Sequence, residues 1–199
     1  DWSYLHGVGR DLRGVDLSGA KMRGANLRSA VLDDIDLSSA DLRNADLSAA
    51  TLRGANLTNA DLSGANLSGA ILLGAILQQT NLTNAILMDA NLSELDLSTT
   101  ILQGVDFSGA DLTYANLTGA HLSDVSLENA DLEETSLEGA TLRNVRLKVA
   151  HLQDTYMGGA DLRCADLRDV DLPGAWLHSA DLRDADLSGV DIADVALAG

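Results

Sequence analysis

The sequence predicts an all-β solenoid, a chain that coils repeatedly around one apolar axis. Three observations support this fold class. A five-residue unit, A-D/N-L-x-x, repeats without a break in register. Its central position is Leu in all of 38 consecutive units between residues 12 and 197 except Met22, Phe107, Met157 and Ile192. Gly stands two residues after the centre in many units, where the chain would have to turn.

The period of five excludes the two simplest elements. Five residues on an α-helix advance the side chain by about 140° net, so the central Leu residues would form no stripe. A long flat strand alternates with period two and cannot keep an odd repeat on one face. A short extended piece followed by a corner fits, because Ala and Leu, two residues apart, then point inward while the intervening Asp or Asn points outward.

The corner has its own signature. A type II turn needs a positive φ at its second central residue, which Gly adopts without steric cost. Asn tolerates the same conformation and replaces Gly at Asn44, Asn59, Asn84 and Asn129. Thr99, Glu134 and Val149 do not suit it, so a mixture of turn types is expected.

The A-D/N-L-x-x motif resembles that of the pentapeptide repeat proteins, over almost the whole chain. The resemblance implies a right-handed quadrilateral β-helix with four units per coil, no inserted loops and about nine coils. With about 4.8 Å between coils, the rod would be roughly 45 Å long. The Leu-rich, loopless pattern is most similar to the cyanobacterial-type members of the family.

The repeat divides the chain into two parts. Residues 11–199 are expected to form a single β-helix, and residues 1–10 either an N-terminal cap, with Trp2, Tyr4 and Leu5 over the open end, or a remnant of upstream sequence. At the other end the repeat runs to Leu197 with no cap. Either the native chain continues there, or two such ends meet in a homodimer.

Composition limits the class of partner. The formal net charge of −17 argues against direct binding to nucleic acid or to anionic membranes. No apolar run approaches the length of a membrane span. One Cys leaves the compartment open, and a cytoplasmic location is favoured if no upstream targeting sequence has been removed.

The charge is polarised when outward residues are assigned to faces by the 20-residue period of the family fold. The units centred on 12, 32, 52 and so on to 192 form what we call the acidic face, which carries two Arg and twelve acids. The acids are Asp11, Asp33, Asp34, Glu94, Asp111, Asp131, Glu133, Glu134, Asp154, Asp171, Asp191 and Asp194. Asp111 should lie beside Asp131, and Asp171 beside Asp191. Either Asp simply suits this repeat position, or the face meets a partner; a cation site has no distinctive ligand spacing.

Two groups of outward apolar residues are candidate interfaces. The first could form an apolar belt around the middle of the rod, or be tolerated drift: Ile71, Leu73, Ile76, Ile86, Met88 and Ile101. The second is Tyr156 and Trp176, which should stack one coil apart, with His178 beside them and room left by Gly158. Such a pair either forms an interface or closes the C-terminal end as a surface stack. The units centred on 22, 42 and so on to 182 form what we call the third face. On it, Arg143, Arg163 and Arg183 should form a solvated salt-bridge ladder with neighbouring Asp residues.

No motif for catalysis, cofactor binding or metal binding is present, so no residue is assigned as catalytic, cofactor-binding or metal-binding. His121, His151 and His178 fall on three different faces, and a solid rod should offer no deep pocket. The sequence therefore predicts a non-enzymatic rod that serves as a protein–protein interaction module or a structural spacer. The alternative resembles the DNA-mimicking, quinolone-resistance branch of the family, whose acidic rods bind DNA gyrase and topoisomerase IV. Twelve acids along roughly 45 Å are much sparser than the charge of duplex DNA, which has one per about 1.7 Å, and projecting loops are absent.

Overall fold

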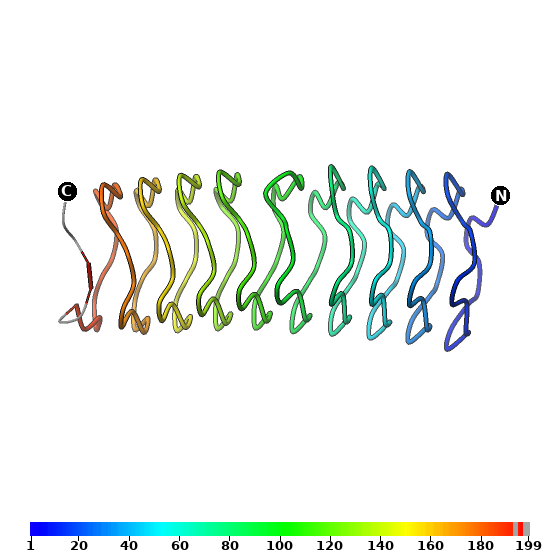
Figure 1. The fold of residues 1–199 in the computed structure, drawn as a ribbon, viewed down its shortest axis with the longest axis horizontal. Coiled ribbons are helices and arrows are strands. Elements are labelled where there is room, and N and C mark those ends of the chain that lie inside the picture. Colours follow the sequence, from blue (N-terminus) through cyan, green and yellow to red (C-terminus); the bar gives the residue numbers. More distant parts are fainter. Residues whose placement is uncertain (193–194, 197–199) are drawn as a thin grey trace.

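The protein is a regular rod in which the chain winds around one long axis (Figure 1). The computed structural model describes residues 1–192, 195 and 196. This part of the chain contains no α-helix and no extended strand; each unit contributes one bridge residue, the Asp/Asn position, followed by a two-residue turn. The bridges are parallel and join residues 20 apart, such as Asp41 to Asp61. Four five-residue units therefore complete one coil.

The core contains the residues that the repeat assigns to it. The central Leu and the preceding Ala are buried in nearly every unit from Ala25 to Leu177. Leu97 and Leu117 are fully buried and lie one coil apart, since Asp96 bridges Asn116. Phe107, the bulkiest residue at a central position, is also fully buried. The predicted inward direction of Ala and Leu is confirmed.

Backbone hydrogen bonds join each coil to the next. Between the units of Asp41 and Asp61, Leu42 N donates to Asp61 O at 2.8 Å and Asp61 N to Ala40 O at 2.9 Å. Within the unit, Ala45 N donates to Leu42 O at 3.0 Å and closes the turn. Repetition of this pattern satisfies the buried backbone groups along the rod, as a solenoid requires.

The expectation of mixed turn types is confirmed at Thr99 and is wrong at Glu134 and Val149. Every corner residue from Tyr4 to Asp184 and Gly189 has a positive φ except Thr99. Glu134 (φ 54°) and Val149 (φ 61°) adopt it in spite of their side chains. The ladder holds them there, because Glu134 N donates to Gln153 O at 3.1 Å and Val149 N to Arg168 O at 3.2 Å in the next coil.

The Asp/Asn position has a structural cause. In unit after unit its Oδ1 accepts the backbone N–H of the residue two positions on, as from Ser63 to Asp61 at 3.0 Å and from Ser68 to Asn66 at 3.0 Å. This is an Asx-turn, which favours Asp and Asn before the corner. The residue therefore both points outward and stabilises the turn.

The N-terminal end of the chain continues this geometry. Trp2 N donates to Lys21 O at 2.7 Å and Tyr4 N to Arg23 O at 3.0 Å, so the first residues pair with the second coil. Trp2 and Tyr4 are exposed, while Leu5 packs against the core. A capping role for residues 1–10 stays a prediction. Asp194, which is predicted on the acidic face, and Leu197, the last predicted central residue, lie outside the described residues.

The ladder is interrupted once in the middle of the described rod. Bridges between residues 76 and 96 and between residues 101 and 121 are missing, although those on either side are present. Thr99, the corner without a positive φ, lies between the two gaps in the sequence. Figure 1 shows the break in regularity in the green part of the rod.

Candidate interaction surfaces

The acidic face contains the predicted column of carboxylates. Asp111 bridges Asp131, and the column continues through His151 to Asp171. Asp111 accepts hydrogen bonds from Thr113 N at 3.1 Å and, through its second oxygen, from Asn91 Nδ2 at 2.9 Å. The hydrogen bond from Thr113 N agrees with a turn-stabilising role for Asp111. Stacking of Asp191 on Asp171 stays a prediction.

Tyr114 is a surface residue that sequence analysis missed. It occupies a corner of the acidic face, is 54 % exposed, and lies in the corner column between Glu94 and Glu134. The negative charge of Glu134 is the largest cause that raises the pKa of the Tyr114 hydroxyl; partial burial and Glu133 add to it. Its place was visible in the sequence, because both glutamates lie 20 residues from it.

The apolar residues from Ile71 to Met88 fall within one 20-residue coil, as a belt around the rod requires. Leu73, Ile76, Ile86 and Met88 are 40–46 % exposed, and Ile71 is half-buried. Their ladder neighbours are polar: Ile71 bridges Thr51 and Asn91, Ile76 bridges Asn56, and Ile86 bridges Asn66 and Asp106. Ile71, Ile76 and Ile86 thus lie on different faces of the same coil, and their polar neighbours belong to the adjacent coils. An interface role for them stays a prediction.

The aromatic cluster is the most organised of the candidate surfaces. Tyr156 and Trp176 bridge each other, and their rings stack with centroids 6.3 Å apart and planes inclined by 30°. Both side chains remain accessible, at 39 % and 51 %. The imidazole of His178 lies over the α-carbon of Gly158, in the space that a β-carbon would fill. We call Tyr156, Trp176 and His178 the aromatic cluster.

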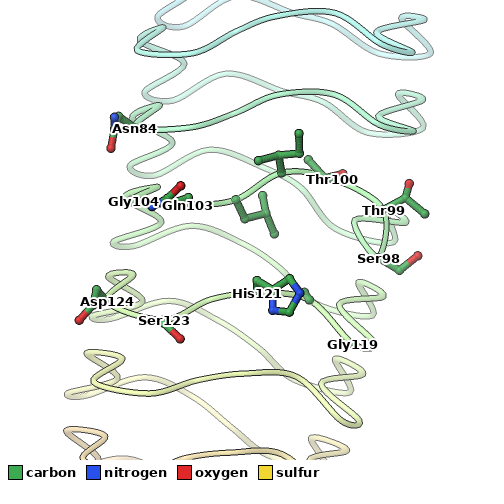
Figure 2. Close-up of a pocket in the computed structure, with 13 residues that line it drawn as sticks. Asn84, Ser98, Thr99, Thr100, Gln103, Gly104, Gly119, His121, Ser123 and Asp124 are labelled. Carbon is green, nitrogen blue, oxygen red and sulfur yellow. The ribbon is translucent and has the colours of Figure 1, made fainter.

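The expectation that the rod offers no deep pocket is wrong. A cavity of about 720 Å³ opens at the interrupted ladder. Residues 98–104 form one wall and residues 119–124 the other, with Asn84 at one end (Figure 2). Sequence analysis missed it because the five-residue register continues through this region without a change.

The family model for pentapeptide repeats matches this chain in eight copies that together run from residue 11 to residue 189. The chain belongs to the pentapeptide repeat family. A comparison with curated proteins gives no match.

Solved structures of other pentapeptide repeat proteins are similar along nearly the whole chain. HetL, from the cyanobacterium Nostoc sp., is described as involved in heterocyst differentiation regulation. It is 34 % identical, with 99 % of this chain and 91 % of that chain covered and a TM-score of 0.55. QnrB1, a plasmid-mediated fluoroquinolone resistance protein, is 23 % identical, with 94 % and 93 % covered and a TM-score of 0.58. The likeness to QnrB1 concerns the fold alone.

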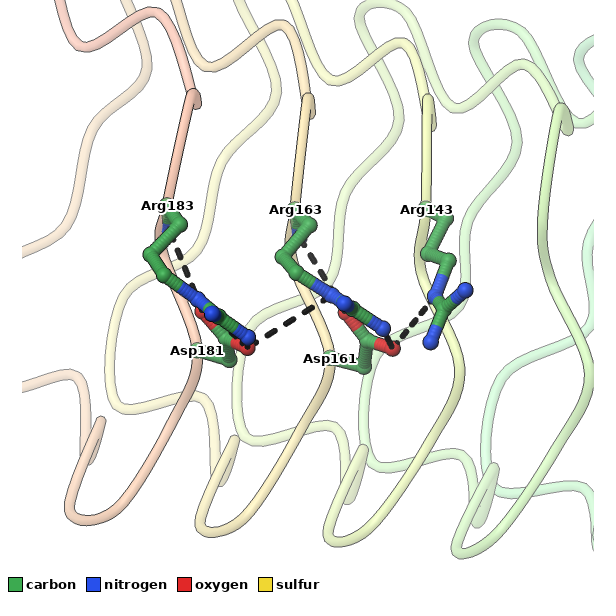
Figure 3. A network of polar contacts seen from close by, with 5 residues as sticks. All are labelled: Arg143, Asp161, Arg163, Asp181 and Arg183. Atoms are coloured by element: carbon green, nitrogen blue, oxygen red, sulfur yellow. Dashed lines mark hydrogen bonds and ion pairs between the residues drawn. The ribbon is translucent and has the colours of Figure 1, made fainter.

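The third face of this pentapeptide repeat rod carries the predicted salt-bridge ladder (Figure 3). Arg143 Nε donates to Asp161, Arg163 Nε pairs with Asp161 at 2.8 Å and with Asp181 at 3.5 Å, and Arg183 Nη2 pairs with Asp181 at 2.6 Å. The hydrogen bond from Arg183 is the main cause that lowers the pKa of Asp181. On this face the Arg and Asp side chains thus pair with one another across successive coils.

The pentapeptide repeat rod shows no sign of a metal centre in its described part. No group of three or more His, Cys, Asp or Glu residues there is placed to hold an ion. Within the same residues, no helix is long and apolar enough to cross a membrane.

Proposed function

We propose that this protein is a non-enzymatic interaction module whose contact surface is the aromatic cluster together with the adjoining acidic face. The observation that carries the proposal is the stacked, accessible pair of Tyr156 and Trp176. Exposed Tyr and Trp concentrate at protein–protein interfaces, because a rigid ring buries much apolar area at little cost in conformational entropy. A right-handed rod of about nine coils would hold this surface rigidly.

The neighbouring charges favour a partner with a basic rim. Glu134 and Asp154 stand at successive corners of the acidic face, on the face next to Tyr156. Carboxylates around an aromatic centre would attract and orient a partner with Lys or Arg at its edge. The regulatory role named for HetL, at 34 % identity over 99 % of this chain, supports a binding role of this general kind.

The second candidate is an acidic DNA mimic that binds DNA gyrase or topoisomerase IV. The acidic face and the fold shared with QnrB1 support it. Against it stands the sparse charge of the acidic face, which is far below that of duplex DNA. We therefore rank it second.

Substitution of Trp176 tests the first candidate. Trp176→Ala should abolish self-association or partner capture while the fold stays intact, because the side chain lies outside the core. Trp2→Ala is the matched control, since Trp2 is 48 % exposed at the other end of the rod. Sedimentation velocity and pull-down with the immobilised rod are the measurements. A monomer without partners before and after Trp176→Ala would favour the spacer role.

A further inference from the structure

The cavity at the interrupted ladder has two open backbone edges. On one wall, Leu102 N, Gly104 N and Thr100 O lack the ladder bonds that their counterparts make in regular coils. On the facing wall, His121 N, His121 O and Ser123 O lack the complementary bonds. Unpaired strand edges of this kind are templates for pairing with another chain.

The two edges are separated because residues 96–104 pair with one neighbouring coil before Thr99 and with the other after it. Before the corner at Thr99, Leu97 N donates forward to Asn116 O at 2.8 Å, and the ladder bonds back to the unit of Ile76 are missing. After the corner, Ile101 N donates back to Thr80 O at 2.9 Å, and the forward bonds to His121 are missing. The segment thus lies close to the following coil before Thr99 and close to the preceding coil after it.

Local contacts hold the corner in this arrangement. The Thr99 Oγ1 atom accepts Gln79 N at 3.4 Å, in place of the usual carbonyl. The Thr100 hydroxyl is buried and donates to Leu77 O at 3.1 Å. Thr80, Thr135 and Thr155 make the same hydroxyl contact where the ladder is regular, so the contact of Thr99 is the one specific to the interruption.

We propose that the cavity binds an extended peptide segment of a partner protein, which inserts between residues 100–104 and 121–123 as an additional parallel rung. Such a segment would accept from Leu102 N, Gly104 N and His121 N and would donate to Thr100 O, His121 O and Ser123 O. Each open group would then regain the bond that the regular ladder gives its counterparts, as in other cases of strand addition. The volume of about 720 Å³ lies within the range of sites that enclose ligands.

The two walls also specify the side chains of the peptide. Leu102 and Leu122 are both buried, so the cavity does not open into the core between them. The inward side chain of an inserted rung must therefore be small, such as Ala. Outward side chains would lie between Ile101, which is 50 % exposed, and the exposed His121. Pro is excluded at the three donating positions because it has no N–H.

This site is distinct from the aromatic cluster, so the two proposals fail separately. The probe is a library of acetylated and amidated heptapeptides with Ala fixed at the centre. It is screened on the immobilised rod, and the best member is labelled and followed by fluorescence polarisation. Saturable binding is expected, with protection of the Leu102, Gly104 and His121 amides from hydrogen exchange. Absence of enrichment, or binding that leaves these amides unprotected, overturns the proposal.

N-methylated peptides test the backbone pairing. Methylation of a nitrogen that donates to His121 O or Ser123 O should weaken binding by about tenfold or more. The matched control is methylation of the nitrogen between these two donors, which faces neither edge and should have a much smaller effect. Equal effects at all positions would exclude insertion as a rung.

A variant that closes the cavity completes the test. Thr99→Gly with Thr100→Ala allows the positive φ found at the other corners and removes the hydroxyl contact to Leu77. We expect the regular ladder to form, the three amides to become protected without peptide, and peptide binding to be lost. Ser39→Gly, at a regular corner with φ 57°, is the control. Undiminished binding by the double variant would contradict the proposal, and its fold can be checked by thermal unfolding.

Discussion

The Oδ1 atom of Asn44 lies in the space that a β-carbon on Gly64, one coil further on, would need. A β-carbon built on Gly64 would stand 2.6 Å from this oxygen. Gly64 also has φ 67°, so two separate constraints favour glycine there. Gly69, at the next corner along the chain, has φ 65° and no atom within 4 Å of the same position.

Alanine substitutions at Gly64 and Gly69 distinguish steric conflict from backbone strain. Gly69→Ala should cost about 1 kcal/mol of unfolding free energy, because only the left-handed conformation is penalised. Gly64→Ala should cost about 2 kcal/mol or more, since Asn44 must also move. Urea denaturation measures both, and adding Asn44→Gly should remove the difference. Equal costs for the two alanines would show that the side chain of Asn44 is free to move away.

The buried Leu column predicts a second contrast. Leu117→Ala should cost about 2–5 kcal/mol, because it leaves a cavity between two stacked coils. Thr118→Ala, one residue further on and exposed, should change stability by less than about 0.5 kcal/mol. Chemical denaturation of both variants tests the register of the repeat. Similar costs would contradict the inward direction of the Leu side chain.

Val149 predicts a stabilising substitution. It is a β-branched residue with φ 61° and 42 % exposure, so it is strained and contributes little to the core. Val149→Asn should raise the unfolding free energy by about 1 kcal/mol, because Asn tolerates this conformation. Asn144→Gly, at the preceding corner, should change it by only a few tenths of a kcal/mol. Calorimetry is the measurement, and a lower melting temperature for Val149→Asn would refute the strain argument.

The ion pair of Asp166 and Arg168 predicts a pH dependence. The hydrogen bond from Arg168 is the largest cause that lowers the pKa of Asp166. Because the folded pKa lies below the unfolded value of about 3.9, the pair contributes stability above about pH 4 and loses it as the pH falls through the lowered pKa. Arg168→Gln should therefore be less stable than wild type at neutral pH, and the gap should close in acid.

The titration of Asp166 checks the same pair directly. By NMR, Arg168→Gln should raise the pKa of Asp166 towards its ordinary value. Arg28→Gln is the control, since the corresponding neighbour of Arg28 is the uncharged Asn26. A stability gap for Arg168→Gln that is the same at every pH would assign its effect to packing instead of charge.

The acidic face gives the test between the two proposed functions. We expect no inhibition of gyrase supercoiling at micromolar protein, because the carboxylates are sparse. If the face does imitate DNA, wild type should inhibit and added salt should weaken the inhibition. Reversal of Asp131, Glu133, Glu134 and Asp154 to Lys should then abolish it and leave folding largely unchanged. Strong inhibition that the reversal removes would place the DNA mimic first.

The fold was predictable because one rule recurs in each unit. The positions of Ala, Leu and Asp fix which side chains point inward, and the corner glycines mark the turns. Glu134 and Val149 escaped this rule because ladder bonds to the next coil override their local preference. The Asx-turns of residues such as Asp61 could have been anticipated from the spacing to the turn.

The candidate surfaces were predictable only in part. The stack of Tyr156 and Trp176 follows directly from the 20-residue period. The position of Ile71, Ile76 and Ile86 on one coil follows from it as well. The cavity beyond Thr99 depends on which of two coils a short segment pairs with, and the repeat pattern is identical for both choices.

The 20-residue coil fixes the angular position of each side chain around the rod as well as its position along the rod. Deletion of one five-residue unit would keep every local preference of the repeat, yet it would turn all later residues by a quarter of a revolution relative to the earlier ones. The carboxylate column from Asp111 to Asp171 and the aromatic pair could then be broken by a change that the core tolerates. Only insertions or deletions of whole coils, in multiples of 20 residues, preserve which side chains stand beside one another. Rods of this kind can therefore change length between relatives and retain a surface, provided that the change is made in complete revolutions.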